Sequence, residues 1–434
     1  MATAMVDAST PHPPTQEDAL ASGTDEESSS DASDEQASLL KEEAHTGDSL
    51  TPLKGRLVSL DVFRGATIVG MILVNNPGTW AHVYPPLRHA EWHGWTPTDL
   101  IFPFFLFIVG VAIPLAYTKR LAQGISRSTL VRKAGKRAVI LFGIGLFMAA
   151  YPIVQIDPTF AWLRPGLGEL RIMGILQRIV LCYIAATLLF LYARPRTRLY
   201  WMGGILLAYW GALVLVPVPG YGAGMLDVPE ATLPAYVDRI VLGTEHLWRG
   251  ADYMWDPEGL LSTFPAIVTT LLGIWTGRLL LSEGRPHTKV ATLFVRGTLL
   301  VVGGYVWSWA FPINKSLWTS SYVLLTGGVA MCALALCYWF VDLKGHKKWT
   351  HPFVVYGVNA LVVFVASTLG TKTLIHLQAT VDGDTMSVQA YLFETVFLPL
   401  ASPMNASLLY AVAYILLWYG VLAVMYRKNI VVTV

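Results

Sequence analysis

The run PTDLIFPFFLFIVGVAIPLAYT occupies residues 97–118 and carries one charged side chain, Asp99, near its start. A bilayer core about 30 Å thick is crossed by roughly 20 apolar residues in a helix, so this run predicts a membrane-spanning helix. Nine further runs have a similar length and composition, and together they predict an all-α polytopic membrane protein with about ten transmembrane helices. The predicted spans are residues 57–76, 97–118, 136–152, 174–193, 199–216, 260–281, 290–311, 320–341, 353–371 and 406–426.

The composition divides the chain into two parts. The whole chain is 54% hydrophobic and 14% charged, whereas an average soluble protein is about a quarter charged, which disfavours a soluble enzyme. Residues 1–50 nevertheless hold 12 of the 29 acidic residues and a single basic one, Lys41. Such a segment buries too little apolar area to offset the entropy cost of ordering. We therefore predict a disordered acidic cytoplasmic tail over residues 1–53 and a multispanning domain over residues 54–430.

The basic residues indicate the orientation of the spans. Alternate connections, together with the chain before the first span and after the last, contain 21 Lys and Arg, and the opposite set contains 7. Because basic loops stay in the cytoplasm, both termini are expected there. The longer opposite loops then face outward, and they carry most of the Trp and His residues outside the tail. We therefore look for function first in the outward loops.

Two charged residues lie within the first predicted span. Asp61 and Arg64 are three residues apart, which places them on one helical face. Ionisable groups at membrane depth are costly and are usually paired or functional. The two residues form either a structural ion pair or a site in which Arg64 holds an anionic group from the cytoplasm and Asp61 orients it. The two interpretations are compatible.

The loop after this span concentrates polar and aromatic side chains. Asn75 lies at the end of the span, and the histidines His82, His89 and His93 follow it. Thr96, Pro97 and Asp99 have the pattern of a helix start. Asp99 therefore either caps the next helix or orients one of the histidines.

Charged residues also lie at the start of the fourth and sixth spans. Arg171 and Arg178 are seven residues apart, so they share a helical face, and Arg178 lies about 10 Å deeper in the membrane. An arginine at that depth must face a polar interior. Asp256 and Glu258 precede the sixth span, where acidic residues either favour the helix N-terminus or take part in chemistry. The three cysteines lie within apolar runs and give no thiolate metal site, and we predict no metal.

These motifs, taken in order, resemble the catalytic membrane region of the heparan-alpha-glucosaminide N-acetyltransferase family, which includes a lysosomal protein and bacterial relatives. The resemblance runs from about residue 56 to residue 428. Its motifs are Arg56 to Gly65; Val74-Asn75; His89-Ala90, Trp92, Gly94 and Asp99 to Pro103; Leu170-Arg171-Ile172, Gly174 and Leu176-Gln177-Arg178; Asp256 to Gly259; and Asn314-Lys315, Leu317-Trp318 and Ser321 to Val323.

The resemblance implies a transmembrane acyltransferase domain. It would transfer an acetyl group from cytosolic acetyl-CoA to an amino sugar on the outer or lumenal face. His89 stands at the family's catalytic histidine position and Asn75 at that of the asparagine that assists it. Histidine suits a base that works near neutral pH, an amide can donate to an oxyanion, and cations bind the phosphates of CoA.

We therefore assign His89 as base or transient acetyl carrier, Asn75 as oxyanion or substrate donor, and Asp99 as the orienting carboxylate. Four residues are assigned to the co-substrate acetyl-CoA: Asp61, Arg64, Gln177 and Arg178. The chain departs from the family in its acidic tail, in the Asn-Pro-Gly-Thr loop at 76–79, and at His93, where the lysosomal sequence has a smaller polar residue.

Other functions stay open. A transporter or flippase for a glycan or lipid precursor would use the buried charged residues to line a substrate path, and an acyltransferase with another donor would act on a different cell-envelope glycan. The expected partners are membrane lipids and an amino-sugar or glycan acceptor, with no nucleic acid, and a homodimer is an open alternative. In a bacterium the location would be the plasma (inner) membrane, and in a eukaryote the lysosomal or another internal membrane.

Overall fold

A computed structural model describes residues 57–153, 167–381 and 384–432. The predicted acidic tail, residues 1–53, lies outside these ranges, so its disorder and the boundary at residue 54 stay predictions. The helices are α2 (Val58–Asn75), α3 (Ile101–Ala122), α4 (Arg127–Ala150), α5 (Ile175–Tyr192), α6 (Pro195–Leu215), α7 (Leu233–Val241), α8 (Thr263–Leu281), α9 (Pro286–Trp307), α10 (Ser320–Cys337), α11 (His351–Val358), α12 (Ala360–His376), α13 (Val388–Leu392) and α14 (Pro403–Arg427).

The predicted all-α polytopic membrane fold is confirmed. Within the described ranges, eight helices are long and apolar enough to cross a bilayer: α2, α3, α5, α6, α8, α9, α10 and α14. The named strands of the described residues form an antiparallel hairpin, β1 (Gln378–Val381) and β2 (Asp384–Ser387), between α12 and α13. The protein is thus an integral multi-pass membrane protein.

Two predicted spans differ from their helices. The span at 136–152 belongs to α4, which begins nine residues earlier and carries five Lys and Arg in its first eleven residues, so it does not count among the eight. The span at 353–371 is not one helix, because α11 and α12 meet at Asn359 with a 72° bend. With this bent pair counted as one span the total reaches nine, and the number ten stays a prediction.

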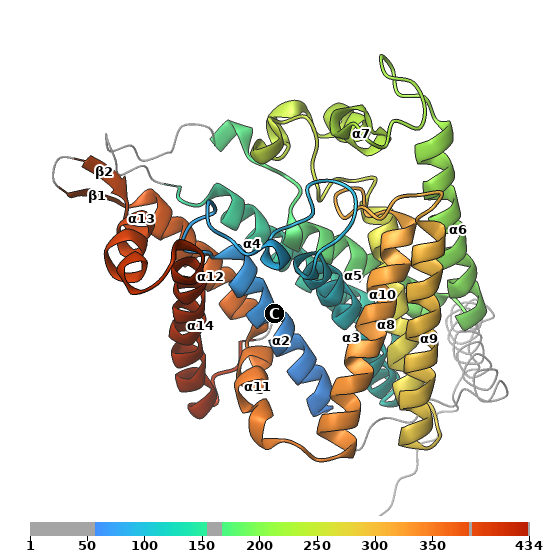
Figure 1. Cartoon of the computed structure of the whole chain (residues 1–434). Helices are drawn as coiled ribbons and strands as arrows, with labels where there is room; N and C mark the ends of the chain where they lie inside the picture. Colours follow the sequence, from blue (N-terminus) through green and yellow to red (C-terminus); the bar gives the residue numbers. More distant parts are fainter. Residues whose placement is uncertain (1–56, 154–166, 382–383, 433–434) are drawn as a thin grey trace, which may run out of the picture. The chain divides into compact units, whose positions relative to one another are not determined.

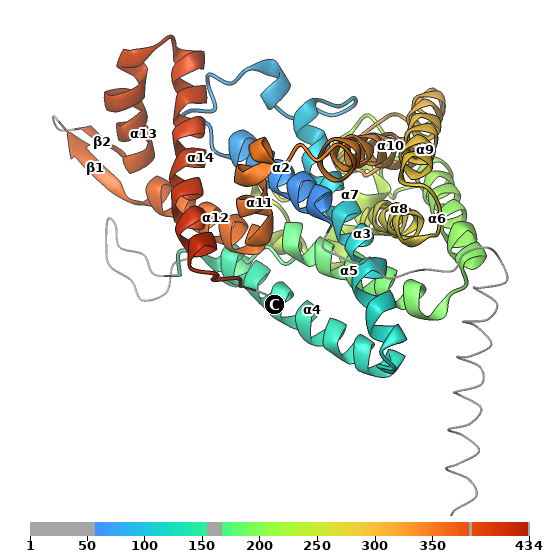
Figure 2. The same ribbon diagram turned by 90° about the horizontal axis from the view of Figure 1, so that it is seen from below.

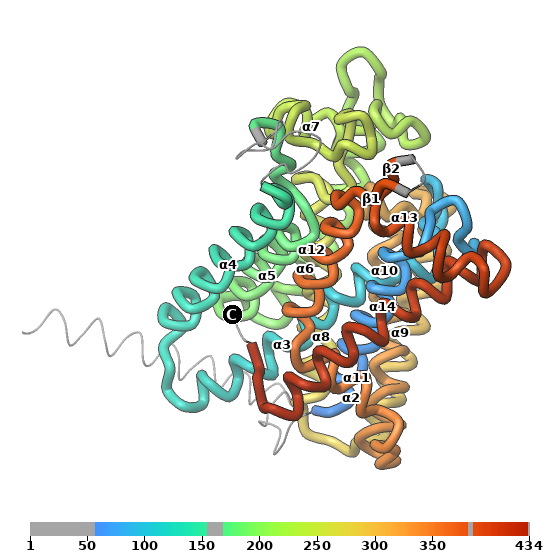
Figure 3. Tube along the Cα trace, turned by 90° about the vertical axis from the view of Figure 1, so that its left-hand side faces the viewer, coloured from blue at the N-terminus to red at the C-terminus, as the bar shows by residue number. Residues whose placement is uncertain are grey.

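Helix α2 occupies the middle of the bundle and contacts α3, α10, α11, α12 and α14 (Figure 1). Helix α4 packs along α5 at the edge of the bundle (Figures 2 and 3). The closest helix pairs meet through glycine. A Cβ on Gly110 of α3 would lie 1.9 Å from the Thr270 carbonyl oxygen of α8, and one on Gly273 would lie 2.1 Å from the Phe107 oxygen. Small residues allow this backbone contact, which helix association in a membrane favours.

The loops that carry the candidate residues gather at one end of the bundle, near α7 (Figure 1). The loop of residues 76–100 leaves the end of α2, and the loop of residues 308–319 leads into α10. Their contact is direct, because the amide of Gly94 donates to the carbonyl oxygen of Ile313 at 2.8 Å. This end of the bundle therefore brings together residues that are more than 200 positions apart.

Candidate active site

His89 and Asp99 form the centre of this end of the bundle. His89 follows a short 3-10 turn at Pro85–Leu87, and its Nδ1 lies 2.6 Å from Oδ1 of Asp99. The Asp99 side chain is 1% exposed, whereas the His89 side chain is 46% exposed. With its proton on Nδ1, the neutral ring donates to Asp99, and Nε2 carries the lone pair that can accept a proton. This arrangement suits a base.

Asp99 also caps the helix that follows. Its Oδ2 accepts from the backbone amides of Thr96 at 3.0 Å and Ala90 at 3.1 Å. The first of these bonds belongs to a capping box at the start of the Pro97–Leu100 turn, which leads into α3. One carboxylate oxygen therefore fixes the helix start while the other contacts the histidine. The two interpretations from the sequence describe different oxygens of one side chain.

Lys315 reaches the same histidine from the other loop. Its Nζ lies 2.9 Å from Nδ1 and 3.3 Å from Nε2 of His89, and 3.4 Å from Oδ1 of Asp99. Burial lowers the pKa of the Lys315 ammonium, although the charges of Asp99 and Glu258 act to raise it. Lys315 belongs to the Asn314-Lys315 motif, whose sequence pattern alone indicates no role for the lysine.

The loop of Lys315 is held rigidly by its neighbours. The side-chain oxygen of the buried Asn314 accepts from the Leu317 amide at 2.8 Å, and the Asn314 amide donates to Oγ1 of Thr319 at 3.0 Å. Trp318 adopts a left-handed backbone conformation, φ +52°, and its ring is 1% exposed. The indole nitrogen of Trp318 donates to Oγ1 of Thr269 on α8 at 3.1 Å. Position 315 is therefore fixed against both α8 and α10.

Arg178 and Gln177 lie in the first turn of α5 and are buried. The Arg178 guanidinium lies 5.2 Å from the centre of the Trp318 ring, and its Nη2 donates to the Gly259 carbonyl oxygen at 3.1 Å and to Oγ of Ser262. Its Nε and Nη1 have no hydrogen-bond partner among the described residues. Arg178 thus faces the protein interior, as expected. Gln177 packs against Gly145 of α4, where a Cβ would lie 2.6 Å from its Oε1.

Arg171 links the segment before α5 to the loop before α8. Its Nε and Nη2 bind the two oxygens of Asp256 at 2.8 and 2.5 Å, and Nη2 also binds Glu258. Burial acts to raise the pKa of Glu258, but the charges of Arg171, Arg178 and Lys315 outweigh it and lower that pKa. These three charged groups are linked to the His89 cluster through the electrostatic interaction of Glu258 with Lys315.

Asp238 on α7 joins the same polar region. The carboxylate is fully buried; Oδ1 accepts from the Leu260 amide at 2.8 Å, and Oδ2 has no hydrogen-bond partner among the described residues. Burial raises the pKa of Asp238 to about 7. Sequence patterns gave no reason to single out this residue, because it is one of many acidic residues in an outward loop.

Asp61 and Arg64 lie elsewhere, in the N-terminal half of α2. Arg64 Nη2 lies 2.5 Å from Oδ1 of Asp61, and the Arg64 side chain is 29% exposed. The backbone beside them packs tightly, since a Cβ on Gly357 of α11 would lie 2.2 Å from the Asp61 carbonyl oxygen. The ion pair that the spacing predicts is therefore present.

Asn75 does not contact the His89 cluster in this structure. Its side chain is exposed, and no hydrogen bond of it is found within the described ranges. The neighbouring Asn76 is buried instead, where its Nδ2 donates to the Ile72 carbonyl oxygen at 2.7 Å and its Oδ1 accepts from Thr371.

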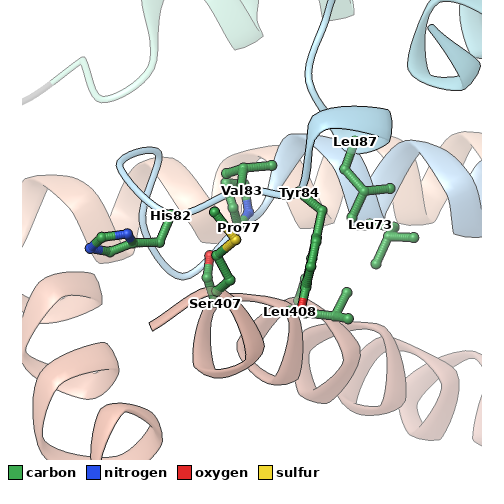
Figure 4. Close-up of a pocket in the computed structure, with 10 residues that line it drawn as sticks. Leu73, Pro77, His82, Val83, Tyr84, Leu87, Ser407 and Leu408 are labelled. Atoms are coloured by element: carbon green, nitrogen blue, oxygen red, sulfur yellow. The ribbon is translucent and has the colours of Figure 1, made fainter. Parts of the chain in front are cut away.

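A small pocket follows Asn75 and Asn76 in the chain. Figure 4 shows Tyr84 of the loop pointing toward α14 beside Leu408, whereas the His82 ring points to the side. Tyr84 closes one side, because its hydroxyl donates to Oδ1 of Asn405 at 2.7 Å. The other lining residues are mainly apolar: Leu73, Pro77, Val83, Leu87, Met404, Ser407, Leu408 and Ala411. The pocket is a packing feature at the end of α2 rather than part of the His89 cluster.

Comparisons with known proteins agree with the motifs. A family model described as a domain of unknown function, DUF5009, matches residues 46–217. The chain is 31% identical over 370 residues to heparan-alpha-glucosaminide N-acetyltransferase of Homo sapiens, and 30% identical over 363 residues to the protein of that name in Mus musculus. The matches cover 73% and 71% of this chain. They cover 53% of each relative, so the chain spans about half the length of the curated relatives it matches. Over this region, the chain belongs to the heparan-alpha-glucosaminide N-acetyltransferase family.

Proposed function

We propose that the protein is a transmembrane acetyltransferase that moves an acetyl group from cytosolic acetyl-CoA to an amino sugar across the membrane. The observation that carries the proposal is the 2.6 Å contact between the exposed His89 and the buried Asp99 in a helical membrane protein. The relatives named as N-acetyltransferases support the reaction class. A glucosaminide-like acceptor is the substrate class proposed from those names.

The chemistry needs a group that removes a proton from the attacking amine. The amine nitrogen bonds to the thioester carbonyl carbon, the carbon to sulfur bond breaks, and CoA leaves as a thiolate. His89 Nε2 takes the amine proton and returns it to the thiolate or to water. Alternatively His89 carries the acetyl group transiently. In both routes Asp99 holds the ring and balances the charge that forms on it.

The donor site is proposed to include Arg64, paired with Asp61, as a contact for the CoA phosphates. Arg178 and Gln177 are proposed to hold the end of acetyl-CoA that approaches the outer side of the membrane. The Nε and Nη1 hydrogens of Arg178 are available to an oxygen of acetyl-CoA. Asn75 remains a proposed hydrogen-bond donor to the substrate, from the exposed end of α2.

The orientation follows the basic residues. We propose that both termini lie in the cytoplasm and that the His89 end faces outward or into a lumen, in the plasma membrane of a bacterium or an internal membrane of a eukaryote. Membrane lipids surround the bundle, and self-association as a homodimer is an open proposal. Orientation is tested by labelling single cysteines at 93 and 285 from each side of sealed vesicles.

The enzymatic test uses purified protein, radiolabelled acetyl-CoA and glucosamine or related amino sugars. Wild type should form acetylated sugar, and His89→Ala should lose that activity while its melting temperature in detergent stays near that of wild type. His82→Ala is the matched control, because it removes an exposed histidine from the same loop. An active His89→Ala variant would contradict the assignment of His89 as the base. Substrate flux across the membrane without release of CoA would indicate a transporter.

A further inference from the structure

A cation that the sequence left without a role touches the proposed base. Lys315 comes from the loop before α10, 226 residues away, and its Nζ lies 3.3 Å from the Nε2 atom of His89. We propose that Lys315 is a second catalytic residue, whose ammonium donates to the carbonyl oxygen of the acetyl thioester as negative charge develops there. The inference rests on the proposed acetyl transfer and adds a residue to its site.

His89 and Lys315 lie close enough to act on one reacting group. In the tetrahedral intermediate, the amine nitrogen beside the base and the oxygen beside the oxyanion donor are bonded to the same carbon, so base and donor must be neighbours. A group in contact with Nε2 of His89 is therefore also within reach of Lys315. The ammonium has three hydrogens, and its neighbours are Nδ1 of His89 at 2.9 Å and Oδ1 of Asp99 at 3.4 Å. With one hydrogen toward each of these atoms, the third remains for a substrate oxygen.

The surroundings keep this cation in place. Its side chain is 22% exposed, and the backbone on either side is fixed by Asn314 and Trp318. Burial lowers the pKa of Lys315, while the charges of Asp99 and Glu258 act to raise it and the charge of Arg178 acts to lower it. A charge held in place in this way costs little reorganisation when the oxyanion forms.

The step balances without another reactant. As the nucleophile bonds to the carbonyl carbon, the π electron pair moves to oxygen and is stabilised by a Lys315 N–H. When the intermediate collapses, that pair re-forms the carbonyl bond and the carbon to sulfur pair leaves with CoA. Lys315 keeps its proton throughout, while His89 handles the proton of the amine. Lys315 therefore stabilises the negative charge on oxygen, and His89 transfers the proton.

Asn75 fits this role less well. The sequence predicts Asn75 as oxyanion or substrate donor, but its side chain is exposed and makes no hydrogen bond to His89 in the described residues. The inference therefore gives the oxyanion to Lys315 and leaves to Asn75 a contact with another part of the substrate.

The kinetic test compares Lys315→Met, Lys315→Arg and Asn75→Ala with Arg249→Met, which removes an exposed cation from the same end of the bundle. Loss of one oxyanion donor lowers kcat about 100-fold to 1000-fold. We expect that loss in Lys315→Met with KM for acetyl-CoA changed less than about threefold, partial recovery in Lys315→Arg, and a smaller loss in Asn75→Ala. A Lys315→Met variant with wild-type kcat overturns the inference.

A binding measurement separates this inference from the proposed function. The probe is a CoA analogue with a trifluoromethyl ketone in place of the thioester, which forms a tetrahedral oxyanion with a nucleophile. Lys315→Met should bind the probe at least about 10-fold more weakly than wild type, and both should bind CoA equally. Equal binding of the probe overturns the role of Lys315 even if wild type acetylates no amino sugar. If Lys315→Met binds the probe more weakly and wild type forms no acetylated amino sugar, Lys315 still belongs to an acyl-CoA site. That result rejects only the amino sugar as the acceptor.

Discussion

The hydroxyl of Tyr322 on α10 donates to the backbone carbonyl oxygen of Asp99 at 2.5 Å. This bond joins the helix that follows the Lys315 loop to the turn that carries the carboxylate beneath His89. Both groups are buried, so neither has water as an alternative partner. The two loops of the candidate site are thus tied together below the site as well as within it.

Replacing Tyr322 by Phe should destabilise the protein. The substitution keeps the ring but leaves the Asp99 carbonyl oxygen without its partner, at a cost of about 1 to 3 kcal/mol. We expect a lower melting temperature in detergent and a modest fall in kcat. An unchanged melting temperature would show that the bond contributes little to the fold.

Replacing Asp99 by Asn should lower kcat strongly, although the two side chains have nearly the same size. The amide retains an oxygen for the helix cap, but it cannot balance the charge of a protonated His89. A loss of at least about 100-fold in kcat is expected from impaired base catalysis. Thr98→Ala is a suitable control, since it alters the same turn without contacting His89. Similar losses in both variants would indicate a general effect of the turn.

Arg171→Met should be one of the most damaging single substitutions. It would leave Asp256 and Glu258 buried without their shared cation, and breaking a buried pair in this way costs about 3 to 5 kcal/mol. Thermal melting and yield after extraction are the measurements. The triple variant Arg171→Met, Asp256→Asn, Glu258→Gln should recover part of the loss, because positions 256 and 258 then carry no charge that needs Arg171 as a partner. No recovery would mean that packing, rather than charge, sets the cost.

Asp238 should give the protein a pH-dependent stability. Its pKa is about 7 in the folded protein, raised from 3.8 by burial, with Asp256 adding to the rise and the Leu260 amide, Arg178 and Arg239 opposing it. The folded state therefore binds more protons than the unfolded state between about pH 4 and pH 7, so this group lowers stability as pH rises through that window. The total is roughly 4 kcal/mol. Asp238→Asn should remove this slope, measured as melting temperature against pH; an identical slope in both proteins would contradict it.

Gly110→Ala should separate α3 from α8. The added methyl group would lie 1.9 Å from a backbone oxygen, and neither helix backbone can yield without repacking. Overpacking of this kind costs about 1 to 3 kcal/mol or more. Gly143→Ala in α4 is the matched control, because its Cβ meets nothing within 4 Å and alanine favours a helix. Equal melting temperatures for the two variants would exclude a tight α3 to α8 contact.

The sequence predicted what depends on local patterns. Apolar runs identified most spans, and the link between His89 and Asp99 could be anticipated because the two are ten residues apart beside a capping motif. The position of Lys315 beside His89 could not, since it depends on how two distant loops fold over the bundle. The bend at Asn359 was also missed, because periodicity cannot distinguish a helix that continues from one that restarts after a single residue.

The bend has a practical consequence for engineered versions of the protein. Asn359 donates to the carbonyl oxygen of Ile430 at 3.0 Å and accepts from the amide of Val432 at 3.0 Å. Residues after α14 therefore stabilise the bend between α11 and α12, and both of these helices pack on α2. Truncation after Arg427 would remove both hydrogen bonds to Asn359. An affinity tag or fluorescent reporter fused after residue 432 needs a spacer, so that Ile430 and Val432 can still bind Asn359.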